Sequence, residues 1–138
     1  MAEIRANLVH LGGCMWVKPP DRLVCEDAEW QAVTERMAAK GYNMILVDLG
    51  EGVRYESHPE IAAEGAWSVA KLRGELARLR GLGLEPIPKM NFSTAHDIWL
   101  GEYHRMVSTP EYYRVCEDLI REAASIFDKP RFFHIGYD

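Results

Sequence analysis

Polar side chains that could do chemistry recur at one kind of place in this sequence, the ends of short apolar runs. The run NMILVD ends on Asp48, and the run LEPIPK ends on Lys89, with Asn91 two residues further. The last run, RFFHIGYD, contains His134 and ends on Asp138. A carboxylate, an ammonium, an amide and an imidazole that converge can bind a polar small molecule and exchange protons with it. The pattern therefore predicts one convergent site.

Each of these residues also has a purely structural interpretation. Asp48 can equally be the polar end of a strand, and a single inward histidine such as His134 is more often a hydrogen-bonded core residue than a catalyst. Lys89 lies between an apolar run and a loop, so an inward orientation requires a carboxylate partner, because an unpaired buried ammonium is costly. Asp48 and Asp138 are the nearest carboxylates in the predicted layout.

The runs that carry these residues alternate with stretches of helical periodicity. Ser68 is expected to cap one helix, and Thr109 before Pro110 predicts the start of another. The predicted buried stripes of the three helices are Trp30, Val33 and Met37, then Leu72, Leu76 and Leu79, then Val115, Leu119, Ala123 and Ile126. The predicted strands are ANLVHLGG, NMILVDLGEG, LEPIPKMNFS and RFFHIGYD.

The order β-α-β-α-β-α-β predicts an α/β fold with parallel strands and crossover helices. The long loops follow strands, while the turns from helix to strand are short, as in a TIM-type (β/α)8 barrel whose site lies at the carboxyl ends of its strands. We therefore expect residues 1–138 to form a single (β/α)4 half-barrel, either part of a larger barrel or a half that assembles with itself. Period-two alternation places His134, Gly136 and Asp138 on one face, with Phe133 and Ile135 packed on helices.

Composition excludes several classes of function. The formal net charge of −5 argues against nucleic acid as a partner. No apolar run approaches the roughly 18 residues of a membrane span, and no segment is typical of a signal peptide, so we expect a cytoplasmic protein without membrane contact. Three widely spaced cysteines without a CxxC pair indicate neither a zinc site nor a disulfide framework. We expect no metal and no cofactor, and the segment HLGGCMW is not a phosphate-binding loop.

Several short motifs, in order, resemble one enzyme family. The second loop reads VRYESHPEI, with Arg54, followed by GAWS; the third strand and its loop read PIPKMNFSTAH, with His96; and the last strand reads HIGYD. From Asn43 to Asp138 the chain is similar to the catalytic barrel of the family 20 glycoside hydrolases, the β-N-acetylhexosaminidases and their relatives. In that family the corresponding strands read approximately Ile-Pro-Glu-Ile-Asp and His-Ile-Gly-Gly-Asp-Glu.

The resemblance implies a carbohydrate ligand of the N-acetylhexosamine type and retaining hydrolysis in which the substrate's own acetamido oxygen attacks the anomeric carbon. Asp138 resembles the aspartate that orients this group and is the expected catalytic residue. The general acid would be the next residue, which the sequence does not contain, so this chain alone is expected to be inactive. Lys89 and Asn91 replace acids of the family pattern, and Tyr137 replaces a glycine. The substrate-binding candidates are Trp16, Asp48, Arg54, Lys89, Asn91, His96 and His134.

Two other interpretations remain open. A non-catalytic half-barrel could bind sugar through Trp16, Trp99 and Arg54, because aromatic side chains beside strand ends form stacking platforms for sugars. Two copies of such a half could also close into a symmetric eight-stranded barrel, since an isolated half leaves two exposed strand edges. A small doubly wound α/β domain that binds a partner is a third interpretation, against which the missing phosphate loop argues.

Overall fold

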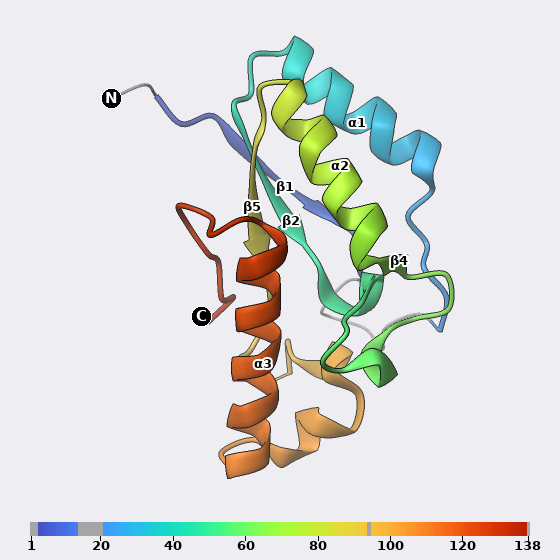
Figure 1. The fold of residues 1–138 in the computed structure, drawn as a ribbon, viewed down its shortest axis with the longest axis vertical. Helices are drawn as coiled ribbons and strands as arrows, with labels where there is room; N and C mark the ends of the chain where they lie inside the picture. Colours follow the sequence, from blue (N-terminus) through green and yellow to red (C-terminus); the bar gives the residue numbers. More distant parts are fainter. Residues whose placement is uncertain (1–2, 14–20, 94, 138) are drawn as a thin grey trace.

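The computed structural model describes residues 3–13, 21–93 and 95–137, and Figure 1 shows their arrangement. Helices and parallel strands alternate along the chain, as expected from the sequence. The strands are β1 (Ala6–His10), β2 (Met44–Asp48), β3 (Val53–Arg54), β4 (Trp67–Ser68) and β5 (Glu85–Lys89). The α-helices are α1 (Asp27–Ala39), α2 (Val69–Gly81) and α3 (Pro110–Ile126). The 3-10 helices are η1 (Gly50–Gly52), η2 (Pro59–Ile61) and η3 (Ile98–Met106).

The main sheet is parallel and three-stranded, in the order β1-β2-β5. Its register aligns the strands in rows, because Leu46 pairs with Leu8 on one side and with Ile87 on the other. Side chains alternate between the two faces of the sheet. Ile45 and Val47 are fully buried and join the core with the leucines of α2. The helices therefore cover one face of the sheet, and the opposite face carries Leu8, Leu46 and the polar strand ends.

The predicted helix starts and most of the buried stripes are confirmed. The hydroxyl oxygens of Ser68 and Thr109 accept hydrogen bonds from the backbone N–H groups of Lys71 and Tyr112, at 3.1 and 3.2 Å, and so cap α2 and α3. All predicted stripe residues of α2 and α3 are buried. On α1 the prediction is wrong at Val33, which is 43% exposed, whereas Thr34 is buried.

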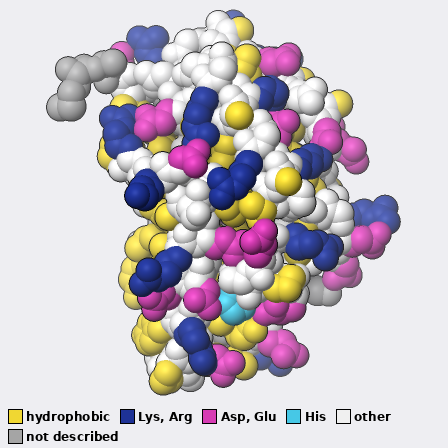
Figure 2. Space-filling view, in the orientation of Figure 1, with side chains coloured by type: hydrophobic (Ala, Val, Ile, Leu, Met, Phe, Trp, Pro, Cys, Tyr) yellow, Lys and Arg dark blue, Asp and Glu magenta, His cyan; other side chains and the backbone are white. Residues whose placement is uncertain are grey.

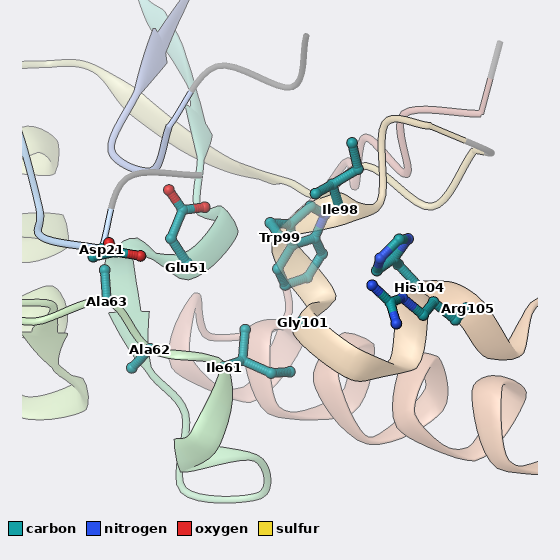
Figure 3. Close-up of a pocket in the computed structure, with 10 residues that line it drawn as sticks. All are labelled: Asp21, Glu51, Ile61, Ala62, Ala63, Ile98, Trp99, Gly101, His104 and Arg105. Carbon is teal, nitrogen blue, oxygen red and sulfur yellow. The ribbon is translucent and has the colours of Figure 1, made fainter. Parts of the chain in front are cut away.

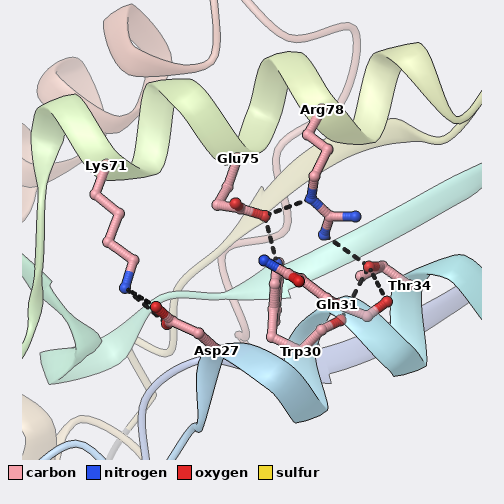
Figure 4. A network of polar contacts seen from close by, with 7 residues as sticks. All are labelled: Asp27, Trp30, Gln31, Thr34, Lys71, Glu75 and Arg78. Atoms are coloured by element: carbon pink, nitrogen blue, oxygen red, sulfur yellow. Dashed lines mark hydrogen bonds and ion pairs between the residues drawn. The ribbon is translucent and has the colours of Figure 1, made fainter.

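A polar network joins α1 to α2, as Figure 4 shows. The Glu75 carboxylate of α2 accepts hydrogen bonds from the indole Nε1–H of Trp30 at 3.0 Å and from Arg78 at 2.8 Å. Arg78 also donates to the Thr34 hydroxyl at 2.8 Å. Toward the first turn of α1, Lys71 pairs with Asp27. Thr34 can be buried because this network satisfies its hydroxyl, which the apolar pattern alone does not reveal.

The fourth predicted strand is reduced to one bridge, between Lys89 and His134. The His134 N–H donates to the Pro88 carbonyl at 3.0 Å, and the Met90 N–H donates to the His134 carbonyl at 2.9 Å. The ladder cannot continue toward the start of β5, because Pro88 has no N–H to donate on this side. It ends in the other direction at Gly136, whose φ of 58° is not extended. The prolines of β5 stand at alternate positions and face away from β2. The hydrogen bonds between β5 and β2 therefore stay intact.

The expected orientation of this last segment is correct only in part. His134 shares the face of Lys89, and Phe133 packs against the core. Ile135 was expected to pack on helices, but it is 47% exposed because the left-handed turn at Gly136 interrupts the alternation. Asp138, which completes the predicted motif, lies outside the described residues.

Acidic and basic side chains are interspersed over the face seen in Figure 2, with no extended basic patch on that face. Several of them form exposed pairs, such as Arg121 with Glu117 within α3. The basic side chains of α2 follow the same pattern, since Lys71 and Arg78 pair with acids. Within the described part of the chain, no helix is long and apolar enough to cross a membrane.

Replacing Glu75 with alanine should weaken the packing of α1 on α2. The buried Trp30 indole N–H and Arg78 would both lose their acceptor, so we expect the free energy of unfolding to fall by about 1–3 kcal/mol. Urea unfolding measures this change. Glu75→Gln, which keeps an acceptor oxygen, should cost less, and Glu35→Ala on the exposed side of α1 should change little. Equal losses for all three variants would contradict the proposed role of the network.

Candidate functional site

One row of polar residues crosses the carboxyl end of the sheet on the face opposite the helices. The register pairs Asp48 at the end of β2 with His10 at the end of β1 and with Lys89 at the end of β5. The Lys89 bridge adds His134 to the same row. Paired residues in neighbouring strands point to the same face. The structure therefore brings Asp48, Lys89 and His134 together in one row, while their role as site residues stays a prediction.

The centre of this row is a buried ion pair. Asp48 and Lys89 are 3% and 4% exposed, and Lys89 Nζ lies 3.1 Å from Asp48 Oδ2. Lys89 also donates to Asn91 Oδ1, and the Asn91 side-chain amide donates to Asp48 Oδ1 at 3.1 Å. Each charge thus faces its opposite and each amide group has a partner, which is the condition for burying such groups. Asp48, one of the two carboxylates expected as partners of Lys89, takes this role.

His10 also contacts the Asp48 carboxylate, and sequence analysis missed it. Its Nδ1 lies 2.9 Å from Asp48 Oδ2, while its side chain is 44% exposed. An imidazole whose Nδ1–H is held by a carboxylate presents Nε2 to a ligand in a fixed orientation. The position of His10 in the sequence could have indicated it. His10 stands near the end of the first apolar run, just as Asp48 and Lys89 stand at the ends of theirs.

Glu51 lies beside this row, held in place by a close crossing of two glycine turns. A Cβ on Gly52 would lie 2.9 Å from the backbone nitrogen of Gly12, so the turns after β1 and β2 can touch only without side chains there. At this crossing the Gly13 N–H donates to Glu51 Oε1. Burial raises the pKa of the Glu51 carboxyl above its usual value; the hydrogen bond from Gly13 opposes this shift, and the nearby charge of Asp48 adds to it.

A cavity of about 460 Å³ opens next to Glu51, between the loops that follow β2 and β5. Figure 3 shows Glu51 and Asp21 on one side and Trp99, His104 and Arg105 on the other. The Trp99 indole Nε1–H donates to the Asn91 carbonyl at 2.8 Å, so this wall is connected to the polar row through Asn91, whose side chain bonds Asp48. Trp99 is only 6% exposed and thus forms part of the wall, not an open stacking platform.

The wall formed by η3 is anchored to α3. Asp97, which precedes η3, is 1% exposed and accepts a hydrogen bond of 2.8 Å from the Tyr112 hydroxyl. Burial and this hydrogen bond raise the pKa of Tyr112 well above its usual value, so it remains a donor. The Tyr112 hydroxyl oxygen also lies 3.1 Å from the Phe92 carbonyl oxygen, so its one proton is shared between the two acceptors. The loop after β5 and the first turn of α3 therefore hold the cavity wall in one position.

The remaining predicted site residues lie apart from the row or outside the described residues. Arg54 is exposed on β3, and no hydrogen bond or ion pair of the described residues joins it to Asp48 or Lys89. His96 is partly buried in the loop after β5, with its Nδ1 3.0 Å from the Ser93 hydroxyl. Trp16 and Asp138 lie outside the described residues, so their roles stay predictions.

The chemistry of this row is that of polar recognition. His134 is exposed, and its Nδ1 accepts a hydrogen bond from the Gly136 N–H at 3.0 Å; among the residues that the structure describes, its Nε2 forms no hydrogen bond. The exposed imidazoles of His10 and His134 lie beside the buried Asp48–Lys89 ion pair. They can form hydrogen bonds with the hydroxyl groups of a polar ligand. No group of three His, Cys, Asp or Glu side chains in residues 3–13, 21–93 and 95–137 is arranged to hold a metal ion.

Comparisons of sequence find no relatives, whereas comparisons of structure do. No family model and no curated protein matches the chain. Among solved structures, the N-acetyl-β-hexosaminidase of Streptomyces plicatus with Thio-NAglucal matches 95% of the chain, with a TM-score of 0.74 and 14% identity. The family 20 β-N-acetylhexosaminidase of Streptomyces coelicolor A3(2) matches equally well, at 15% identity.

The chain shares the fold of these hexosaminidases. It spans about a third of their length, since the matched part is 32% of each of those chains. The resemblance drawn from the short motifs is thereby confirmed at the level of the fold. The described part of this chain is a mixed α/β structure with parallel strands, consistent with part of a TIM-type barrel.

Breaking the Asp48–Lys89 pair should destabilise the protein strongly. In Lys89→Met the Asp48 carboxylate would stay buried without its cation, so we expect a loss of about 3 kcal/mol in the free energy of unfolding. The double variant Asp48→Asn/Lys89→Met should recover much of that loss, because it buries no net charge. Arg121→Met, which breaks an exposed pair on α3, should cost less than about 0.5 kcal/mol. Additive losses in the urea unfolding of the double variant would contradict a coupled pair.

Replacing Glu51 with glutamine should change how stability depends on pH. Because the pKa of Glu51 is raised in the folded state, the native protein binds this proton more tightly than the unfolded chain does. The contribution is complete below the usual carboxyl pKa and is lost as pH rises through the raised value. Urea unfolding across the acidic range should therefore show a less negative slope in Glu51→Gln than in the parent, with Glu35→Gln unchanged. Identical slopes in all three proteins would contradict the raised pKa.

Proposed function

We propose that the carboxyl end of the sheet binds an N-acetylhexosamine-type sugar as part of a glycoside-hydrolase-related (β/α)8 barrel. The observation that carries this proposal is the row His10, Asp48, Lys89 and His134, which lies beside a ligand-sized cavity on a hexosaminidase-like fold. Active sites of such barrels lie at the carboxyl ends of the strands. In this proposal residues 1–138 supply one (β/α)4 half, with the segment around His134 in the place of the fourth strand.

The proposed chemistry is hydrolysis assisted by the substrate. The acetamido oxygen of the sugar attacks its own anomeric carbon while the bond to the leaving oxygen breaks and a carboxylic acid protonates that oxygen. Asp138 would orient the acetamido group and stabilise its developing positive charge. His10 and His134 would bind hydroxyl groups of the same sugar. A polypeptide limited to these 138 residues lacks the acid that the family pattern places after Asp138, so we expect it to bind without turnover.

A second candidate function is a non-catalytic half-barrel that assembles with itself. The apolar surface beside the outer edge of the sheet favours it, because Phe132, Ile135 and Tyr137 are 46%, 47% and 78% exposed. Two copies could cover these side chains and close an eight-stranded barrel. Light scattering at micromolar concentration distinguishes the candidates: a stable dimer supports this assembly, and a well-folded monomer excludes it.

Binding of a thiazoline mimic of N-acetylglucosamine tests the proposed function. Its fused ring resembles the sugar after the acetamido attack, so calorimetry should detect binding that Asp138→Ala weakens by at least about tenfold, which is the value of one charged hydrogen bond. His10→Asn should weaken binding less, because an amide can still donate to a hydroxyl group. Asp128→Ala, a change in the exposed turn after α3, is the matched control. Equal affinity in the parent and in Asp138→Ala would refute the assignment of Asp138.

A further inference from the structure

We propose that the cavity beside Glu51 is a subsite for a negatively charged sugar unit, bound through Arg105 and His104. This inference rests on the proposed function, because it assigns the unit next to the N-acetylhexosamine in the same ligand. The ligand would be an oligosaccharide whose neighbouring unit carries a carboxylate or a sulfate ester. Both groups are planar or tetrahedral arrays of oxygen atoms with delocalised negative charge, and both match a guanidinium group.

The wall of the cavity that carries Arg105 and His104 has polar groups without internal partners. Arg105 and His104 come from the end of η3, and among the described residues neither forms an ion pair or a side-chain hydrogen bond. Most other arginines lie against carboxylates; examples are Arg22 with Glu64, Arg78 with Glu75 and Arg131 with Glu85. A guanidinium that lines a cavity without an internal partner is available to an anionic ligand.

The acids of this cavity lie on the wall opposite Arg105. Glu51 already accepts the Gly13 N–H through Oε1, so this oxygen is engaged within the protein. Asp21 lies on the same side as Glu51, across the cavity from Arg105, as Figure 3 shows. An anion held at Arg105 is thus separated from both acids by the width of the cavity.

The size and lining of the cavity fit a sugar unit. Its volume of about 460 Å³ falls in the range of small-molecule sites, roughly 300–1,000 Å³. Between the two charged sides the lining is apolar, with Ile61, Ala62, Ala63, Ile98 and Trp99. Apolar side chains pack against the C–H faces of a sugar ring while the charged ends orient it. Because Trp99 is bonded to the Asn91 carbonyl, this unit would lie next to the sugar held at the polar row.

Calorimetric titration with matched disaccharides tests the inference. The probes are a neutral disaccharide of N-acetylglucosamine, one with a glucuronate unit and one with a sulfated unit. The parent protein should prefer at least one anionic probe by about tenfold, the value of one good charged pair, and added salt should reduce that preference. Arg105→Gln combined with His104→Asn should abolish the preference, because it should lower the affinity for the anionic probe much more than the affinity for the neutral probe. Arg114→Gln on the exposed surface of α3 is the matched control and should keep it.

The outcomes separate this inference from the proposed function. Equal affinity of the parent for all three probes would overturn the inference and leave the proposed function standing. A preference that persists in the double variant would also overturn it, because the anion would then bind elsewhere. Absence of binding to every probe would overturn both. A preference for glucuronate alone or for sulfate alone supports the inference and identifies which anion the site accepts.

Discussion

The carboxylate of Asp48 is the group on which the rest of the site depends. It lies at the end of the central strand. Its Oδ2 faces both Lys89 from one neighbouring strand and His10 from the other, while its Oδ1 accepts a hydrogen bond from the Asn91 side-chain amide. A charge buried to this extent is stable only if its partners hold their positions. The ion pair therefore aligns the ends of β1, β2 and β5 and at the same time orients the imidazole that a ligand would meet.

This arrangement gives the site a charge balance different from that of the family pattern. The segment PIPKMNFSTAH resembles a family pattern that has acids at the positions of Lys89 and Asn91. In the structure these two residues do not add a free positive charge to the site, because Asp48 neutralises Lys89. An arginine without an ion pair among the described residues, Arg105, lies instead on the wall of the adjacent cavity, next to His104. The buried ion pair and the arginine of the cavity wall thus belong to different elements, the sheet and η3.

Much of the fold could be predicted from the sequence, because its signals are local. Ser68 and Thr109 cap helices by hydrogen bonds within one turn, and the leucines of α2 repeat at helical spacing. The fourth strand could not be predicted in detail, since its length depends on which side of β5 Pro88 faces. That orientation follows from the pairing of β5 with β2, a long-range feature that no local pattern contains.

The site, like the fourth strand, could be predicted only where the signal is local. Asp48 and Lys89 could be expected to pair because a buried lysine needs a carboxylate. His10 could not be chosen without the register, because a histidine at a strand end has no distinctive spacing of its own. Glu51 depends on the contact between Gly12 and Gly52, and Trp99 on its bond to the Asn91 carbonyl, and both contacts join loops from different strands.

Binding of a sugar at the carboxyl end of the sheet, beside Asp48, can be followed by nuclear magnetic resonance, through the indole N–H signals during titration with the thiazoline mimic. We expect the signal of Trp99, which donates to the Asn91 carbonyl beside the polar row, to shift with ligand concentration. The signal of Trp30, bonded to Glu75 between α1 and α2, should stay constant. A shift of the Trp30 signal with a constant Trp99 signal, or no shift of either at saturating ligand, would contradict binding at this site.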